Sequence, residues 1–476
     1  MSTAQSLAST RIASLLDANS FVEIGGMITA RSTDFNLTSQ DTPSDGVITG
    51  YGLIDGSLVY VYSQDASVLN GTIGEMHAKK ISNIYSLAMK TGAPVIGLID
   101  CAGIRLQEAT DALNAFGQIY LNQTMASGVI PQITGIFGTC GGGLAMIPAL
   151  TDFTFMEGKK AKLFVNSPNA IAGNQIAKCD TSAADFQAEG GLVDFVGTED
   201  EIFAQMRALI SMLPANNEDD ASYEECTDDL NRVCADLANC AGDTAIALSQ
   251  IADNGVFVET KKDYAKSMVT GFIRLNGMTV GAVANRGEIY DETGALVESF
   301  GGMMTSAGAK KAAEFVNFCD AFAIPVLTLV NVKGFEASKC SEKHMPKSVA
   351  KLIYAYANAT TPKVTVVVGA AYGSAYVAMN SKSIGADMVY AWPTAEIGMM
   401  DAKMAAKIMY PNGNAEEINE KAAEYATLQS SVVSAARRGY VDAVIEPEDT
   451  RKHVIGAFEM LFTKREDRPG KKHGTV

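Results

Sequence analysis

The segment from Pro131 to Pro148, PQITGIFGTCGGGLAMIP, carries the features on which the fold prediction depends. Ile133, Ile136 and Phe137 predict a short buried strand, and an apolar helix is expected to begin after the glycines. The glycines from Gly141 to Gly143 allow the backbone to approach a ligand closely, because they carry no Cβ atom. Free N–H groups at a helix start favour a negatively charged oxygen. A glycine-rich turn alone is more often a result of tight packing, so its meaning depends on whether the chain repeats it.

The chain does repeat this pattern, at a constant shift of 231 residues (325 − 94 = 231). In both halves a proline precedes an apolar run and then a turn of small residues, so Gly143 and Ser374 occupy equivalent positions. The pairs at this shift are Pro94 with Pro325, Pro131 with Pro362, and Ala78-Lys79-Lys80 with Ala309-Lys310-Lys311. A slightly shorter shift relates Gly50 and Gly56 to Gly271 and Gly277, as expected of diverged copies with different loops. The repeat predicts two copies of one fold and overrides the three domains that length alone suggests.

Composition limits the possible partners of the chain. Apolar residues make up 47% and charged residues 19% of the 476 residues, which is typical of a globular protein. The formal charge of −16 argues against nucleic acid as a partner, because phosphate contacts need clustered lysine and arginine. A local basic lining for a small anionic ligand is still compatible with this charge.

Cysteine, histidine and hydropathy patterns predict a cytoplasmic protein without a metal site. The 8 cysteines include no Cys-x-x-Cys pair, and the spacing of Cys226, Cys234 and Cys240 fits no common zinc or disulfide pattern. The sequence also lacks a His-Glu-x-x-His motif. The N-terminal residues show no signal-peptide pattern, and no uninterrupted apolar run reaches about 18 residues. We therefore expect reduced cysteines, no metal and a cytoplasmic location.

Local patterns predict an alternation of strands and helices, and hence an α/β fold with right-handed crossovers. The acidic stretch of residues 213–229 is expected to be a linker, with a solvated loop as the alternative. We place the domains at residues 1–232 and 233–476. The elements predicted in the first domain are a helix at 7–16, an edge strand at 21–24, an exposed loop at 31–45, a hairpin at 47–62 around Asp55-Gly56, a helix at 76–89 capped by Gly92, and a buried strand at 94–100.

Familiar catalytic constellations do not occur in this sequence. No Gly-x-Ser-x-Gly elbow accompanies His77, His344 or His453, which we interpret as surface or packing residues. The glycine turn lacks the Lys-Ser/Thr ending of a phosphate loop. Glu108 and Asp111 could form a carboxylate pair, although a pair of charges at a helix start is commoner.

The two small-residue turns remain as the candidate sites. Each could direct backbone N–H groups at a developing oxyanion, and chemistry without a protein acid or base indicates an enolate. A donor fixed at an enolate oxygen lowers the barrier by ~3 kcal/mol. Two such turns imply two carbonyl-bearing ligands.

Several long segments of the chain resemble one protein family over nearly its full length. This family is the carboxyltransferase component of biotin-dependent acyl-CoA carboxylases, of the propionyl-CoA carboxylase β type, and the chain is also similar to the equivalent subunit of sodium-pumping decarboxylases. The resemblance implies a tandem repeat of two ClpP/crotonase-like β-β-α superhelix domains. The segments that carry it are GVITGYGLIDGSLVYVYSQD, GEMHAKKI, MKTGAPVIGLID, SGVIPQITGIFGTCGGG, NATTPKVTVVVGAAYGSAY, VYAWPTAEIGMM and RRGYVDAVIEPEDTR.

The resemblance also implies a role for each turn. Gly142 and Gly143 would offer amides to the thioester oxygen of acyl-CoA, and Ser374 and Ala375 would offer theirs to the ureido oxygen of biotin. Biotin would give up CO2 and its nitrogen would take the α-proton, so no protein base would be needed. Arg105 would lie near CoA, although a structural salt bridge is an equal alternative for it. The substrate-binding residues implied are Gly103, Arg105, Gly141, Gly334, Phe335, Tyr372, Gly373 and Val377.

Partners follow from the same resemblance. Because the chain contains no Ala-Met-Lys-Met attachment motif, biotin is expected on a biotin carboxyl carrier protein. Further expected partners are a biotin carboxylase or the membrane subunits of a decarboxylase. The chain is expected to form a homo-oligomer, a hexamer built as a trimer of dimers, with acyl-CoA and carboxybiotin meeting at the dimer interface.

The chain departs from the family pattern mainly on the side expected to face biotin. Gly373-Ser374-Ala375 replaces Gly-Gly-Ala, and Val377 stands where relatives that use short acyl groups often carry an acid. Lys333-Gly334-Phe335 replaces Pro-Gly-Phe, and residues 347–351 differ from the usual Arg-His-Gly-Ala-Lys. These departures leave three alternatives: carboxylation of an acyl-CoA, decarboxylation of a malonyl-type or glutaconyl thioester, and a scaffold that has lost catalysis.

Overall fold

The computed structural model describes residues 6–31, 41–219, 223–291 and 293–470. The chain divides into two compact units, Met1–Ser222 (unit 1) and Tyr223–Val476 (unit 2). This division falls N-terminal to the boundary after residue 232 that the sequence predicts. Most of the loop predicted at residues 31–45 lies outside the described residues.

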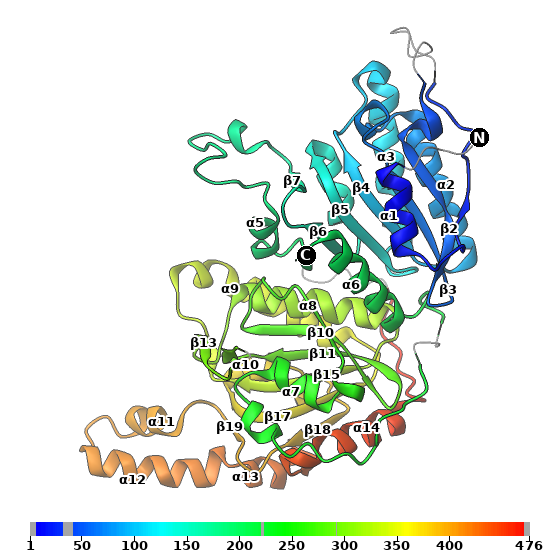
Figure 1. Cartoon of the computed structure of the whole chain (residues 1–476). Coiled ribbons are helices and arrows are strands. Elements are labelled where there is room, and N and C mark those ends of the chain that lie inside the picture. The colour runs from blue at the N-terminus through cyan, green and yellow to red at the C-terminus, as the bar shows by residue number, and fades with distance from the viewer. Residues whose placement is uncertain (1–5, 32–40, 220–222, 292, 471–476) are drawn as a thin grey trace. The chain divides into compact units, whose positions relative to one another are not determined.

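Unit 1 is built around an eight-stranded sheet (Figure 1). Its strands are β1 (Val22–Glu23), β2 (Val47–Ile54), β3 (Ser57–Gln64), β4 (Val95–Cys101), β5 (Gln132–Gly141), β6 (Phe153–Glu157), β7 (Lys162–Phe164) and β8 (Phe195–Gly197). The order is β1-β2-β3-β4-β5-β6-β8, and β7 pairs with the C-terminal end of β5. Strands β1 to β3 pair antiparallel and the others parallel. The predicted edge strand, hairpin and buried strand are confirmed.

Helices connect these strands and pack on the sheet. Helix α2 packs on β2 and β3, α3 packs on α2, and α1 packs together with α6. Gly92 ends α2 in the left-handed conformation with φ = +65°, which confirms the predicted cap. The helices of unit 1 are α1 (Leu7–Leu15), η2 (Pro43–Gly46), η3 (Leu69–Gly71), α2 (Glu75–Thr91), η4 (Leu106–Glu108), α3 (Ala109–Ala126), η5 (Gly142–Ala145), α4 (Met146–Ala149), η6 (Pro168–Ala170), α5 (Ala184–Glu189) and α6 (Glu199–Met212).

Unit 2 contains a second eight-stranded sheet and two small sheets. The large sheet consists of β9 (Phe257–Thr260), β10 (Met268–Leu275), β11 (Met278–Asn285), β15 (Val326–Val332), β17 (Lys363–Tyr372), β18 (Met388–Ala391), β19 (Glu396–Gly398) and β20 (Ala443–Val444). Its order is β20-β18-β17-β15-β11-β10-β9, with β19 on the end of β17. The small sheets pair β12 (Glu288–Tyr290) with β13 (Leu296–Ser299), and β14 (Met303–Met304) with β16 (Gly334–Phe335).

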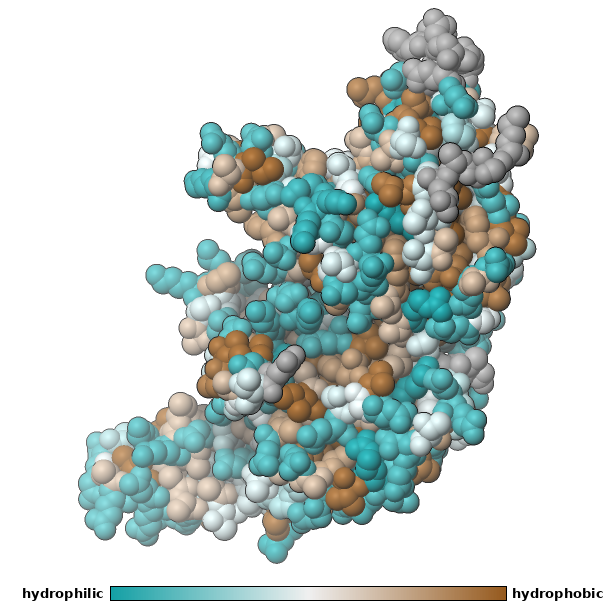
Figure 2. All heavy atoms as spheres, viewed as in Figure 1, coloured by the Kyte–Doolittle hydropathy of each residue, from teal (hydrophilic) through white to brown (hydrophobic). Residues whose placement is uncertain are grey.

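The helices of unit 2 include a pair that projects from the sheet. In Figure 1, α11 and α12 extend away from the rest of this unit, and α12 has no buried residue. Figure 2 shows mostly hydrophilic residues with a few hydrophobic ones over this pair. The helices are η7 (Leu237–Cys240), α7 (Thr244–Ile251), η8 (Asp253–Gly255), α8 (Ser306–Ala321), α9 (Lys339–Asn358), α10 (Gly373–Ala378), η9 (Lys382–Ile384), α11 (Ala402–Met409), α12 (Ala415–Tyr425), η10 (Ala426–Ser430, a π-helix), α13 (Val432–Arg437), η11 (Pro447–Asp449) and α14 (Thr450–Leu461).

The two large sheets have the same strand order and the same irregularities. Strands β4 and β15 are related by a shift of 231 residues (326 − 95 = 231), and so are β5 and β17 (363 − 132 = 231). The register between each pair shifts once, after Ile99 in unit 1 and after Val330 in unit 2. Two buried lysines at the same shift, Lys80 and Lys311, each donate hydrogen bonds to two backbone carbonyl groups earlier in the chain. Carbonyl oxygens in the core thereby solvate each ammonium group.

Candidate active site

The glycine turn of unit 1 lies at the C-terminal end of a central strand. Strand β5 runs on through Gly141, so the strand is longer than the sequence suggests. The chain then turns at Gly142, whose φ is +65°, and continues as η5 and α4. Each of these helices has only 4 residues, so the predicted apolar helix is confined to two short turns before β6. The N–H groups of a first helical turn have no partner within the helix.

Conformation, and not packing, requires glycine at Gly142. A Cβ atom placed there would meet nothing within 4 Å, yet the left-handed φ is costly for other residues. Gly143 is exposed, and its carbonyl accepts a hydrogen bond of 2.5 Å from Tyr120 Oη on α3. The turn therefore presents exposed backbone that a neighbouring phenol holds in place.

Unit 2 has the same backbone geometry at the equivalent positions. Gly373, 231 residues after Gly142, has φ = +59° and begins α10 at the end of β17. A second pair of left-handed glycines follows the neighbouring strands, where Gly103 has φ = +112° and Gly334 has φ = +150°. Because carboxyl ends of adjacent parallel strands meet at one sheet edge, each unit places two such turns together.

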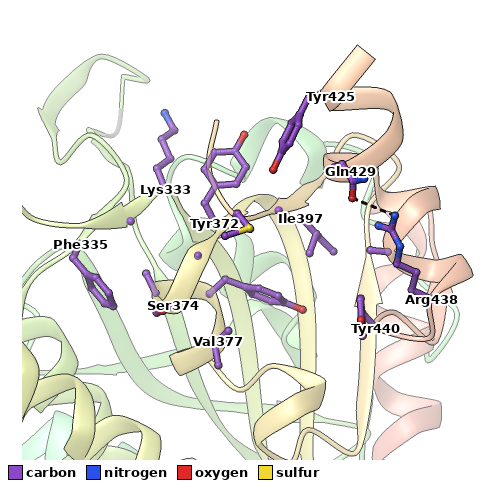
Figure 3. A pocket seen from close by; sticks show the side chains of 17 residues that line it. Lys333, Phe335, Tyr372, Ser374, Val377, Ile397, Tyr425, Gln429, Arg438 and Tyr440 are labelled. Atoms are coloured by element: carbon purple, nitrogen blue, oxygen red, sulfur yellow. Dashed lines mark hydrogen bonds between the residues drawn. The ribbon is translucent and has the colours of Figure 1, made fainter. Parts of the chain in front are cut away.

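The turn of unit 2 lines a cavity of about 750 Å³. All of the site residues predicted in this half line it, namely Gly334, Phe335, Tyr372, Gly373, Ser374, Ala375 and Val377. Figure 3 shows Phe335, Tyr372, Ser374 and Val377 on one side of the cavity. The opposite side is formed by residues that sequence reasoning missed, including Tyr425, Gln429, Arg438 and Tyr440. These residues follow α11 in the chain, and no short motif marked them as part of the site.

Two tyrosines of the cavity, Tyr372 and Tyr376, stay protonated near neutral pH. Tyr372 Oη donates a hydrogen bond to the Glu396 carboxylate. Burial and then this hydrogen bond raise the pKa of Tyr372 well above its usual range. Burial raises the pKa of Tyr376 to about 12. Both side chains are therefore hydrogen-bond donors and apolar surfaces, and not bases.

Arg105 lies in a buried ion-pair network, with 1% of its side chain exposed. Its Nη1 contacts Asp45 Oδ1 at 2.6 Å and Glu108 Oε1 at 2.9 Å, and its Nη2 donates to Thr72 O at 2.6 Å. Burial raises the pKa of Asp45, and the Arg105 charge opposes this shift. This geometry supports the structural interpretation of Arg105, because the guanidinium is buried and bound to protein groups through all three of its nitrogens. Arg105 anchors the loop that follows Gly103.

The other titratable candidates also have structural roles. Glu108 accepts hydrogen bonds from Arg105 and from the Glu75 N–H at the start of α2, whereas Asp111 pairs with Arg31. They are separate charges at helix starts and not a catalytic pair. His77 is fully buried, with Nδ1 2.9 Å from Asp45 O, and burial lowers its pKa to about 3.

The remaining histidines fit the same interpretation. The His453 ring packs against Tyr390, and His344 is exposed. The prediction that His77, His344 and His453 are surface or packing residues is confirmed.

No cluster of three or more potential metal ligands occurs among the described residues. Within the same residues, every helix is too short or too polar to span a membrane.

Comparison with known proteins defines the class to which these turns and this cavity belong. The carboxyl transferase domain family matches residues 2–476, and the chain belongs to this family. The protein is an enzyme, a carboxyltransferase of the kind found in biotin-dependent acyl-CoA carboxylases and transcarboxylases. The resemblance inferred from the sequence is thereby confirmed.

The relatives include both carboxylases and decarboxylases. The chain is 41% identical to methylmalonyl-CoA decarboxylase subunit alpha of Propionigenium modestum and 40% identical to the propionyl-CoA carboxylase beta chain of Roseobacter denitrificans. Each alignment covers 98% of this chain and 92% of the relative. The crystal structure of the transcarboxylase 12S hexamer with methylmalonyl-coenzyme A bound matches with a TM-score of 0.92 and 38% identity, over 98% of this chain and 92% of that one.

Proposed function

We propose that this enzyme moves a carboxyl group between carboxybiotin on a carrier protein and the α-carbon of a short acyl-CoA, through an enolate held by backbone amides. The observation that carries the proposal is the pair of left-handed glycines, Gly142 and Gly373, at equivalent strand ends. Two matched turns supply two oxyanion sites, one for each carbonyl-bearing reactant.

The thioester is assigned to the turn of unit 1. The amides of Gly142 and Gly143 would bind the thioester oxygen, where negative charge develops as the enolate forms. Donors fixed in advance at that oxygen can lower the barrier by ~3 kcal/mol each. Gly103 and Gly141 border this position, since Cys101 and Cys140 are partners in neighbouring strands. Exposure of Gly143 leaves room for the substrate to approach its amide.

The biotin ring is assigned to the cavity of unit 2, whose lining suits it. Phe335, Tyr372 and Val377 offer apolar and aromatic surface for a flat ring, and Ser374 and Ala375 lie in the first turn of α10 with amides for its ureido oxygen. When bound, carboxybiotin supplies the transferred carboxyl group and a nitrogen that can exchange a proton. The described cavity lining contains neither histidine nor carboxylate, which supports a reaction without a protein base.

The repeat supports a finer description of the fold. We assign both sheets to one ClpP/crotonase-like superhelix, present in tandem in the two units Met1–Ser222 and Tyr223–Val476. Equal strand order, equal register shifts and equivalent buried lysines support a common origin.

The proposed assembly is a homohexamer that works with a separate biotin carrier protein. The 12S relative forms a hexamer, which supports this choice. Carboxylation would require a biotin carboxylase partner, whereas decarboxylation would require membrane subunits that use the released energy. Relatives of both kinds match equally well, so the direction of the reaction is decided by experiment.

The test is a carboxyl-exchange assay on the intact protein. A panel of acetyl-, propionyl-, malonyl-, methylmalonyl- and glutaconyl-CoA is incubated with a biotinylated carrier protein, and carboxyl transfer is followed with labelled carbon. We expect transfer to or from at least one short thioester, in a biotin-dependent manner. Absence of transfer with every thioester, from a folded protein that binds the carrier, would reject catalysis in favour of a scaffold.

A further inference from the structure

Two cationic side chains line the cavity of unit 2, and its described lining includes no carboxylate. These are Lys333 and Arg438, and Figure 3 shows them on opposite sides of the cavity. The other lining residues are aromatic, aliphatic or small, apart from Gln429. A cavity whose charged groups are all positive attracts anions and concentrates them.

Arg438 is held by neutral groups and keeps free donors. Its Nη2 donates to Gln429 Oε1 at 3.2 Å and to Leu428 O at 3.4 Å, both in the π-helix η10. Among the described residues, Nε and Nη1 have no hydrogen-bond partner and the guanidinium forms no ion pair. Figure 3 shows the contact with Gln429, which fixes the guanidinium at the cavity wall. A guanidinium fork with unused donors is suited to a carboxylate.

Lys333 is anchored through its backbone and its methylene groups. Its N–H donates to Gly302 O at 2.8 Å, and its methylenes lie 3.4–3.6 Å from the position of a Cβ at Gly302. The carboxylates of Glu396 and Glu336 accept hydrogen bonds from Tyr372 and Ser341, respectively. Within the described part of the chain, the Lys333 ammonium forms no ion pair.

We propose that Arg438 forms a carboxylate-binding subsite that recognises the transferred carboxyl group while biotin carries it, and that Lys333, on the opposite side of the cavity, adds a longer-range attraction for the same charge. The proposal rests on the function assigned above to this cavity. A carboxylated ureido ring bears a negative charge and the free ring bears none, so the subsite would bind the loaded carrier in preference to the empty one. Loss of the carboxyl group removes this attraction and favours release of the carrier.

Equilibrium binding tests the subsite without turnover. The probes are two stable biotin amides, one with an N1′-carboxymethyl group and one with an N1′-methyl group, titrated into the intact protein by calorimetry. The wild type is expected to bind the charged probe about tenfold to a hundredfold more tightly, as a charge-assisted hydrogen bond allows. Arg438→Met should abolish most of this preference, and Lys333→Met should reduce it. Arg437→Met is the matched control, because Arg437 is the exposed neighbour in α13 and does not line the cavity.

Kinetics then identify the source of the carboxylate. In Arg438→Met, the KM for the carboxylated carrier should rise about tenfold, with little change in the KM for the uncarboxylated carrier. A rise confined to a carboxylated acyl-CoA would overturn the assignment of the subsite to carboxybiotin. Equal effects on charged and neutral probes, or a preference retained by both variants, would overturn it. An inactive wild type that still prefers the charged probe would count against the proposed function alone.

Discussion

At the scale of single residues, Gly142 provides a direct test of the oxyanion proposal. Its φ of +65° is unfavourable for alanine, and the added methyl group would meet no atom within 4 Å. Gly142→Ala should therefore lower the free energy of unfolding by about 1 kcal/mol, through backbone strain alone. If the Gly142 peptide must present its N–H group to the enolate, carboxyl transfer should fall about tenfold to a hundredfold. The measurements are the kcat of exchange and denaturant unfolding.

Gly56→Ala supplies the matched control for this variant. Gly56 lies in the β2–β3 hairpin with φ = +82°, and nothing lies within 4 Å of its Cβ position. The loss of stability should be similar, while carboxyl transfer should be unchanged. An equal loss of activity in both alanine variants would mean that strain, and not the orientation of the Gly142 amide, determines the rate.

Tyr120 is expected to act as a positioning residue for the same turn. Tyr120→Phe removes the hydrogen bond from Oη to Gly143 O, which is worth about 0.5–1.5 kcal/mol. The expected result is a fall in kcat of about two- to tenfold, with little change in the KM for acyl-CoA, because the phenol acts through the Gly143 backbone. Tyr51→Phe, in β2, should leave both constants unchanged. A larger effect on KM than on kcat would contradict a positioning role.

Asp152 makes the stability of unit 1 depend on pH. Burial raises the pKa of this half-buried carboxyl to about 7, and the nearby Asp194 also raises it. Because the folded state binds the proton more tightly than the unfolded state, stability falls as pH rises from about 4 to about 7. The loss is at most about 4 kcal/mol, reduced by solvent screening. Asp152→Asn should remove this slope in urea unfolding, and should make the protein more stable than wild type at pH 8.

The equivalent carboxylate of unit 2 is the contrasting case. Asp387 Oδ2 accepts a hydrogen bond of 2.8 Å from the Lys363 N–H. The same oxygen forms an ion pair with Lys464 Nζ, also at 2.8 Å. Asp387→Asn removes the negative partner of Lys464 and should destabilise the protein at pH 8. Among the described residues no cation pairs with Asp152, and we attribute the contrast to this difference. Stabilisation of both asparagine variants at pH 8 would contradict that interpretation.

At the scale of elements, the sequence predicts the helices and strands because their signals are local. Gly92 caps α2, the Asp55-Gly56 turn joins β2 to β3, and the apolar run before Asp100 forms β4. The 231-residue repeat extends this local information to the second sheet. The length of β5 is less predictable, because pairing with β7 over residues 139–141 continues the strand into the glycines.

The candidate site is predictable from the sequence only in part. The small-residue turns can be recognised in the sequence by their glycines, and the structure places Gly142 and Gly373 at equivalent strand ends. The cavity wall around Arg438 comes from a segment about 60 residues further along the chain, which only tertiary packing brings near. The role of Arg105 is hard to predict for a different reason. An arginine in a family motif looks the same in the sequence whether it binds a ligand or forms an ion pair, as Arg105 does with Asp45.

At the scale of the whole molecule, the proposed assembly determines which defects can be rescued. We expect the thioester turn of one protomer to work with the biotin cavity of another. Symmetric dimers repeat the same contact twice, so each pair of protomers would hold two identical shared sites. If both protomers carry the same defective turn, both shared sites of the dimer are damaged. In each site the half contributed by the other unit stays intact.

Mixing two inactive variants tests this arrangement. Gly143→Trp places a large side chain where the thioester would lie, and Ser374→Pro removes an amide from α10 at a position in the first turn that tolerates proline. Each variant alone should be inactive, because every site has one damaged turn. After subunit exchange, a heterodimer has one site with both defects and one with neither, so activity should return in proportion to exchange. Sites built within a single chain would regain nothing. Exchange confirmed by native mass spectrometry without recovered turnover would therefore reject the shared site, and thermal unfolding of each variant verifies that both remain folded.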